Sequence, residues 1–194
     1  MRLALIPGHG NRYRGGKFRY DPGAASGGVI EAEWVRALCE RVTELSPHGM
    51  AEVFDEPQLG GPLSTYTHRR KAAMRWIGDG PAVVCHVHCN GGGGRYSLAM
   101  HDPRSRAGAA YAVALTDRLS REAPVLTSRM PCKVMPARRS DGWKHAANLL
   151  EPTYSAPAGI CALLVEWGFV DGPDAAGFYP STLDEMAHGL VSLI

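Results

Sequence analysis

Histidines follow two apolar segments of the chain, and imidazole is well suited to binding metals and moving protons near neutral pH. His9 stands between Gly8 and Gly10, which let the backbone turn sharply and present the ring. His86 and His88 are two residues apart, so both rings face the same side of a strand. Such a pair can bind one metal ion, or one ring can bind while the other packs. The simpler alternatives are that His86 and His88 have a structural role only, and that His9 lies in a loop without a specific function.

Two glutamates are candidates for metal binding and proton transfer. Glu166 ends the apolar run 162–165, where partial loss of water would raise the pKa of its carboxyl and suit it to general acid–base catalysis. A capping or ion-paired glutamate is the alternative there. Glu31 follows a glycine-rich segment at the start of a predicted helix, where the helix dipole favours an anion whatever its role. Glu33 competes with Glu31, and chemistry alone does not separate the two.

The elements that must position these residues alternate between strands and helices. Apolar runs predict buried parallel strands at 3–6, 82–88 and 160–166, and weaker ones at 50–54 and 96–100. Apolar residues at helical spacing predict helices at 30–45, 63–77, 106–119 and 183–193. The pattern predicts a single α/β domain over residues 1–194, with a mostly parallel, twisted sheet and helices on both faces. Ligands bind outside the carboxyl ends of such strands, where His9, His88 and Glu166 fall.

The composition excludes several classes of protein. The chain of 194 residues suffices for one good core, and 21 Lys+Arg against 19 Asp+Glu give a net charge of only +2. That balance excludes a strongly basic nucleic-acid binder. The apolar runs are too short for a membrane span or for a signal peptide. We therefore expect the protein to be made in the cytoplasm and not to insert into a membrane. Five cysteines, an odd number with three in apolar runs, are typical of buried thiols in a reduced compartment.

Several motifs, taken together, resemble one family of enzymes. They are Gly8-His9-Gly10, Asp21-Pro22-Gly23-Ala24, Gly28-x-x-Glu31, His88-Cys89-Asn90 and Val165-Glu166-Trp167-Gly168-Phe169-Val170. Their order and spacing resemble the zinc-dependent N-acetylmuramoyl-L-alanine amidases called Amidase_3. Arg69 or Arg70, on the predicted second helix, is similar to an arginine common in that region. The resemblance covers nearly the whole chain, and the combination is specific although each piece alone is weak.

The resemblance implies that His9, Glu31 and His88 hold a Zn²⁺ ion and that Glu166 is the catalytic carboxylate. Two histidines and one carboxylate leave a fourth position open for water, the pattern of hydrolytic rather than structural zinc. The metal would lower the pKa of that water and polarise the scissile carbonyl. The bond cut would join the lactyl group of N-acetylmuramic acid to L-alanine in peptidoglycan.

Three further residues are candidate substrate contacts: His86, Asn90 and Arg70. The chain also departs from the family, because His9 and Glu31 lie 22 positions apart, more than we expect. The extra length is the segment 11–20, in which basic and aromatic residues are interleaved. Such a segment could hold an anionic or sugar-rich polymer, or it could be a solvated loop without a specific role.

These features predict a catalytic domain that degrades peptidoglycan, acts as a monomer and resembles a phage or prophage endolysin. An endolysin made without a signal peptide would reach the cell wall after release through a holin-type pore. Two alternatives stay open. One is a zinc peptidase or another amidohydrolase on a related scaffold, which would share the metal site. The other, without enzymatic activity, is a degenerate wall-binding module.

Overall fold

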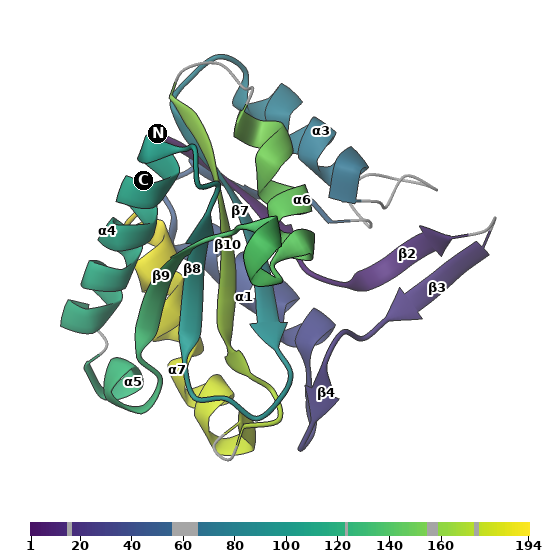
Figure 1. The fold of residues 1–194 in the computed structure, drawn as a ribbon, viewed down its shortest axis with the longest axis vertical. Coiled ribbons are helices and arrows are strands. Elements are labelled where there is room, and N and C mark those ends of the chain that lie inside the picture. Colours follow the sequence, from purple (N-terminus) through teal and green to yellow (C-terminus); the bar gives the residue numbers. More distant parts are fainter. Residues whose placement is uncertain (15–16, 56–65, 123, 155–158, 173–174) are drawn as a thin grey trace.

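A six-stranded sheet forms the centre of the computed structural model, which describes residues 1–14, 17–55, 66–122, 124–154, 159–172 and 175–194 (Figure 1). The strands are β1 (Arg2–Pro7), β6 (Ala51–Val53), β7 (Ala82–Asn90), β8 (Ser97–His101), β9 (Cys132–Pro136) and β10 (Ile160–Phe169). They lie in the order β6-β1-β7-β10-β8-β9. The first four in that order are parallel, whereas β8 is antiparallel to β10 and β9 is parallel to β8.

Helices cover both faces of this sheet (Figure 1). They are α1 (Glu31–Leu45), α3 (Tyr66–Ile77), α4 (Arg106–Glu122), α5 (Pro124–Arg129), α6 (Lys144–Tyr154) and α7 (Ala175–Val191). Successive residues of a strand face opposite sides, so Leu5 packs in a core with α1, α4 and α7, while Ile6 packs in a second core with α3 and α6. Because both faces are covered, the central strands are mostly apolar. The predicted fold class is confirmed.

The predicted strands and helices are present, with some ends shifted. The predicted residues 63–65 lie outside the described residues, and α3 is described from Tyr66. α7 begins at Ala175 rather than at 183, because Pro180 inside it obscures the helical signal. β9, α5 and α6 were not predicted from the sequence. β9 ends at Pro136 and α6 contains Pro152, and proline favours turns over regular structure.

The segment between His9 and Glu31 forms two small antiparallel sheets. β2 (Gly10–Arg14) and β3 (Lys17–Asp21) make a hairpin that extends away from the central sheet (Figure 1). Its register places Gly10 opposite Asp21, so the hairpin returns the chain to the neighbourhood of His9. β4 (Ala25–Ser26) then pairs with β5 (Val29–Ile30), which leads directly into α1. The contact of the segment 11–20 with a polymer stays a prediction.

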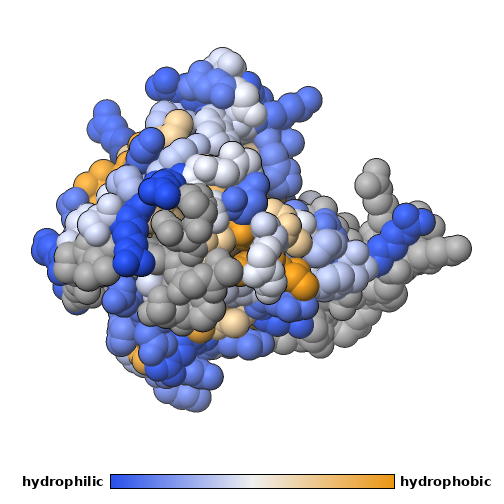
Figure 2. Space-filling model, turned by 90° about the horizontal axis from the view of Figure 1, so that it is seen from below, coloured by the Kyte–Doolittle hydropathy of each residue, from blue (hydrophilic) through white to orange (hydrophobic). Residues whose placement is uncertain are grey.

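The surface seen in one view is mostly hydrophilic, and most of the cysteines are buried. Figure 2 shows one face, on which hydrophilic residues predominate and hydrophobic ones form small patches. Within the described ranges, no helix combines the length and apolarity needed to cross a bilayer. All five cysteines are described and free; Cys132 is half-buried and the other four are buried. Cys89 packs in the core under α1, on the opposite side of the sheet from His88, as strand alternation predicts.

Candidate metal centre

His9, Glu31 and His88 come together at the carboxyl edge of the parallel strands. His9 follows β1, His88 lies near the end of β7, and Glu31 is the first residue of α1. Oε1 of Glu31 lies 3.3 Å from Nε2 of His9 and 3.2 Å from Nδ1 of His88. Two atoms that each lie about 2.0–2.1 Å from a tetrahedral zinc are about 3.3 Å apart, so this spacing fits that ion. Glu33 is exposed, and its Oε1 lies 3.4 Å from the hydroxyl of Tyr20 instead.

Further polar contacts hold Glu31 and His9 in place. The backbone N–H of Cys89 donates to Oε1 of Glu31 (3.0 Å), and that of Ala24 donates to Oε2 (2.9 Å). Oδ2 of Asp21 lies 3.2 Å from Nδ1 of His9, which leaves Nε2 of that ring to face Glu31. A carboxylate on the second nitrogen fixes the orientation and tautomer of a metal-binding histidine. Asp21 thus orients the ring of His9, a contact that the sequence did not reveal.

The electrostatics of the site favour the metal-binding forms of Glu31 and His88. Burial acts to raise the pKa of Glu31, but the hydrogen bonds and charges of His88 and His9 outweigh it and hold the pKa far below its usual range. Burial acts to lower the pKa of His9, yet Glu31 and Asp21 raise it. At His88 burial dominates, and the pKa is lowered although Glu31 opposes this. Near neutral pH Glu31 is thus ionised and His88 neutral, the forms in which these side chains bind metals.

Two glycines leave the space that the candidate ligands fill. A Cβ atom at Gly8 would lie 2.5 Å from Nδ1 of His88. A Cβ atom at Gly23 would lie 2.5 Å from Oε2 of Glu31 and 2.6 Å from Cδ2 of His9. Gly23 also has a φ of +69°, a conformation that side chains rarely adopt. Neither position accepts a larger residue without moving a candidate ligand.

We expect Gly23→Ala to weaken zinc binding by about 10- to 100-fold, because the added methyl group would displace Glu31 or His9. Gly28→Ala is the matched control, since Gly28 has a φ of +84° and open space where its Cβ would lie. Both variants should lose about 1–2 kcal/mol of stability from the strained backbone. Only Gly23→Ala should lose zinc in a competition with a chelator. Equal zinc affinities for the two variants would contradict this prediction.

Arg69 of α3 holds the backbone that presents His9. Its side chain is 1% exposed; Nη1 donates to the carbonyl oxygens of Pro7 (2.8 Å) and His9 (3.2 Å), and Nη2 lies 3.2 Å from Asp55. His9 has a φ of +58°, a left-handed conformation that costs a residue other than glycine about 1–3 kcal/mol. Its N–H donates to the hydroxyl of Tyr66 (2.9 Å). These contacts keep a strained residue in a fixed place.

Replacing Arg69 by methionine should lower the free energy of unfolding by about 3 kcal/mol, because it removes a buried partner of Asp55 and two hydrogen bonds. Asp55 keeps its contact with Arg36 (2.6 Å), which limits the loss. Arg70→Met is the control, since Arg70 is the next residue and only half-buried; it should change stability by less than about 1 kcal/mol. Denaturant unfolding measures both, and similar losses would refute the distinction.

Glu166 lies beside His88 on the neighbouring strand. β10 pairs with β7 so that Glu166 is opposite His88, and an irregularity follows before Phe169 pairs with Asn90. The side chain is half-buried, but its Oε2 is buried and has no hydrogen-bond partner among the described residues. Burial, reinforced by the charge of Glu31, raises the pKa of Glu166 to about 8. Such a carboxyl can hold and release a proton near neutral pH, as general acid–base catalysis requires.

The candidate substrate contacts lie at this edge in different environments. His86 is fully buried, and neither ring nitrogen has a hydrogen-bond partner in the part of the chain that is described. Burial and the nearby charges of His88 and Arg70 lower its pKa to about 3. Asn90 is half-buried, Arg70 is half-buried on α3, and both stand near the same end of the sheet. The contact of all three with a substrate stays a prediction.

Known proteins resemble this chain in structure but not in overall sequence. No family model and no curated protein matches the sequence. The structure superposes on N-acetylmuramoyl-L-alanine amidase AmiC2 of Nostoc punctiforme with a TM-score of 0.68, over 100% of this chain and 94% of that chain, at 16% identity. The chain has the amidase fold. Two further solved structures share this fold. One is an N-acetylmuramoyl-L-alanine amidase from Clostridium difficile 630, with a TM-score of 0.66 and 16% identity over 99% of this chain and 93% of that chain. The other is the catalytic domain of the CD27L endolysin, with a TM-score of 0.61 and 18% identity over 100% of this chain and 96% of that chain.

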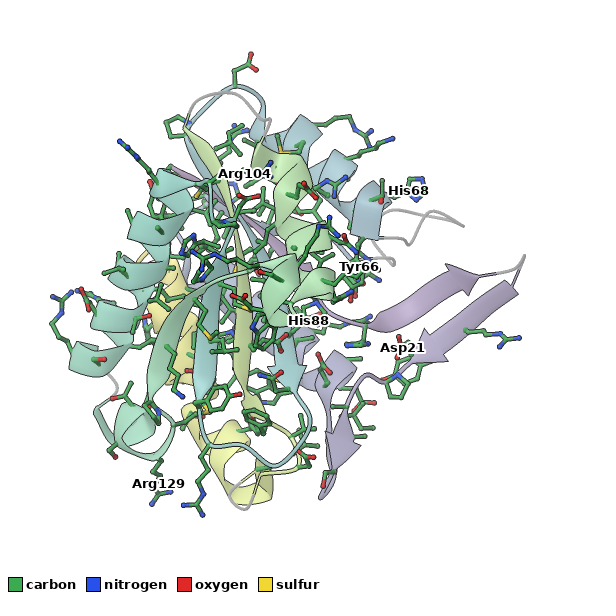
Figure 3. The ribbon with its side chains drawn as sticks, in the orientation of Figure 1. Asp21, Tyr66, His68, His88, Arg104 and Arg129 are labelled. Atoms are coloured by element: carbon green, nitrogen blue, oxygen red, sulfur yellow. The ribbon has the colours of Figure 1, made fainter. Side chains whose placement is uncertain are left out.

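The amidase fold of this chain brings two more side chains close to the candidate metal centre, Tyr66 on α3 and His145 on α6. The ring centroid of Tyr66 lies 5.8 Å from that of His88, and the centroid of His145 lies 6.2 Å from it. Figure 3 shows Tyr66, His88 and Asp21 gathered where α3, α6 and the hairpin approach one another. The sequence carries no signal for Tyr66 or His145, because packing alone decides which face of a helix meets the site.

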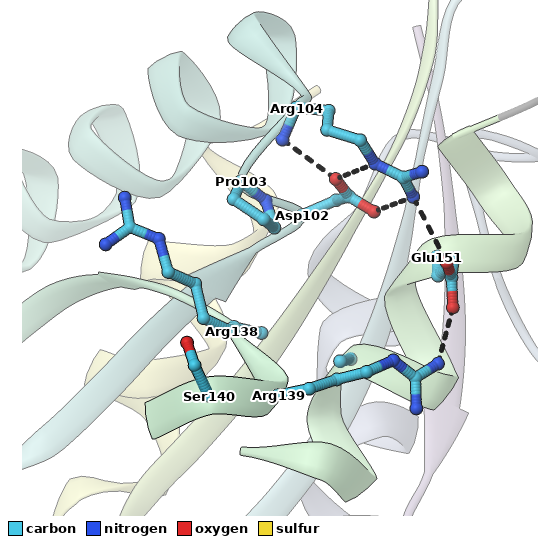
Figure 4. A pocket seen from close by; sticks show the side chains of 9 residues that line it. Asp102, Pro103, Arg104, Arg138, Arg139, Ser140 and Glu151 are labelled. Atoms are coloured by element: carbon cyan, nitrogen blue, oxygen red, sulfur yellow. Dashed lines mark hydrogen bonds and ion pairs between the residues drawn. The ribbon is translucent and has the colours of Figure 1, made fainter. Parts of the chain in front are cut away.

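A cavity of about 350 Å³ lies elsewhere in the amidase fold, between α6 and the loop before α4. Arg104 donates to both carboxylate oxygens of Asp102 (2.9 and 2.7 Å), and Arg139 donates to Glu151 (2.5 Å) (Figure 4). None of the candidate metal ligands lines this cavity. The cavity is therefore separate from the candidate metal centre, and the four charged side chains named here have partners within the protein.

Proposed function

We propose that the protein is a zinc-dependent N-acetylmuramoyl-L-alanine amidase, which hydrolyses the amide bond between N-acetylmuramic acid and L-alanine in bacterial peptidoglycan. The observation that carries the proposal is the group of His9, Glu31 and His88, with Oε1 of Glu31 3.2–3.3 Å from both rings and the half-buried carboxyl of Glu166 alongside. The fold shared with solved N-acetylmuramoyl-L-alanine amidases along the whole chain supports it.

Each residue has a distinct task in the proposed reaction. His9, Glu31 and His88 would hold the zinc ion, which when bound supplies a Lewis acid that lowers the pKa of water and polarises a carbonyl. In its ionised form, Glu166 would accept a proton from the attacking water as the water oxygen bonds to the lactyl carbonyl carbon. The same carboxyl would then give that proton to the alanine nitrogen as the C–N bond breaks. Asp21 would keep His9 oriented.

Digestion of purified peptidoglycan tests this reaction. We expect new amino termini of L-alanine and no new reducing sugar ends. Cleavage between amino acids of the stem peptide would favour a zinc peptidase or another amidohydrolase instead. Binding to cell walls without cleavage would favour a degenerate wall-binding module. Glu33→Gln, which changes an exposed glutamate two residues from Glu31, should digest the polymer as the wild type does.

We further propose a lytic role, that of a phage or prophage endolysin that acts as a monomer and reaches the wall through a holin-type pore. The shared fold with the catalytic domain of the CD27L endolysin supports this role. Expression in a bacterial host with and without a separate holin tests it. We expect lysis only when the holin is present, and lysis without it would contradict release through a pore. Light scattering of the purified chain tests the monomer.

A further inference from the structure

His145 lies at the outer side of the metal centre, in the first turn of α6. Its ring centroid is 6.2 Å from that of His88, with the ring planes at 84°, and 6.1 Å from that of Tyr66. His88 is only 3% exposed, whereas His145 is exposed. An imidazole thus stands next to a buried candidate ligand and remains accessible from solvent, the side from which a substrate approaches.

Four elements that are separate in the sequence contribute to this place. Tyr66 of α3 lies 5.8 Å from His88 on β7, and His145 of α6 meets the same tyrosine. Glu166 of β10 is opposite His88 in the sheet. The strands therefore supply the candidate ligand His88 and the carboxyl of Glu166. α6 supplies the imidazole of His145 as a further polar group for a substrate bound beside them.

On the basis of the proposed function, we propose that His145 is a further catalytic residue, which donates a hydrogen bond to the carbonyl oxygen of the muramoyl amide as negative charge develops on it. A neutral imidazole carries one N–H donor, so the role needs no change of protonation. Fixed donors aimed at such an oxygen stabilise the transition state more than the ground state. No bond to His145 forms or breaks.

His145 stands outside the candidate ligand set. Across the described residues, the group whose ligand atoms all lie within 4.8 Å of one another consists of His9, Glu31 and His88. The zinc content should therefore not depend on His145. This separates the residue from the ligands, whose loss would remove zinc and activity together.

The test compares His145→Ala, His145→Gln and His48→Ala as zinc-loaded proteins acting on a soluble muramoyl peptide. We expect His145→Ala to lower kcat by about 10- to 1,000-fold, with zinc content and unfolding midpoint unchanged. His145→Gln should recover part of the loss, because a carboxamide also donates an N–H. His48 is exposed on the turn before β6, and its replacement should leave kcat unchanged.

Three results would overturn the assignment while the proposed function stands. They are an unchanged kcat in His145→Ala, a glutamine variant no better than the alanine variant, and a loss of zinc that parallels the loss of activity. If the wild-type protein releases no L-alanine amine from the muramoyl peptide, the proposed function itself fails, and the role of His145 fails with it.

Discussion

The Glu166→Gln variant should be nearly inactive and yet more stable than the wild-type protein when zinc is absent. Loss of the group that moves the proton should lower the rate of L-alanine release by about 100- to 10,000-fold. Glutamine has almost the same shape as glutamate, so zinc binding by His9, Glu31 and His88 should persist. A variant that keeps wild-type activity would exclude Glu166 as the catalytic carboxylate.

The gain in stability follows from the raised pKa of Glu166. Burial and the charge of Glu31 raise this pKa from 4.5 to about 8, so between these pH values the folded chain holds a proton that the unfolded chain has released. The wild-type protein should therefore lose stability as the pH rises through this range, by up to about 3 kcal/mol at pH 7. Partial exposure of the side chain reduces that figure. Glutamine has no proton to lose and should escape the decline.

Denaturant unfolding of the chelator-treated proteins, from about pH 5 to about pH 8, measures this difference. The curves of the wild type and Glu166→Gln should lie close together at the acidic end and diverge toward the alkaline end. Glu33→Gln should follow the wild type throughout, because Glu33 is exposed. Parallel curves for wild type and Glu166→Gln would show that the carboxyl at 166 titrates normally.

The convergence of His9, His88 and Glu166 could be predicted from the sequence because it depends on one topological rule. Parallel strands end at the same edge of a sheet, and these strands are visible as apolar runs since helices cover both faces. The choice of Glu31 over Glu33 came only from a motif. In the structure the two differ plainly: Glu31, the first residue of α1, faces the histidines, whereas Glu33, the third, is exposed.

Contacts that depend on register or helix rotation could not be predicted in the same way. Asp21 reaches His9 because the hairpin pairs Gly10 with Asp21. A glycine pair at positions 15–16, between two short runs with aromatic residues, is a hairpin signal that could have indicated this return. On α3, Arg69 and Arg70 are adjacent in sequence but point about 100° apart, so only packing shows that Arg69 is the buried one.

Zinc should stabilise the wild-type protein and leave His88→Ala unaffected. A metal that binds only the folded chain adds about 4 kcal/mol when its free concentration is 1,000 times the Kd. His88 supplies Nδ1 to the group that includes Glu31, so its loss leaves two candidate ligands. A chelator should abolish the activity of the wild-type protein, and added zinc should restore it there but not in His88→Ala.

His86→Leu separates loss of a ligand from damage to the core. His86 lies two residues away on the same face of β7 and is fully buried, but it is not one of the candidate ligands. Its replacement removes two ring nitrogens that have no partner among the described residues, so folding should be preserved. We expect His86→Leu to bind zinc and gain stability from it as the wild type does. Near-stoichiometric zinc in His88→Ala, measured by elemental analysis, would contradict the ligand set, because a site of two remaining side chains could not hold the ion so tightly.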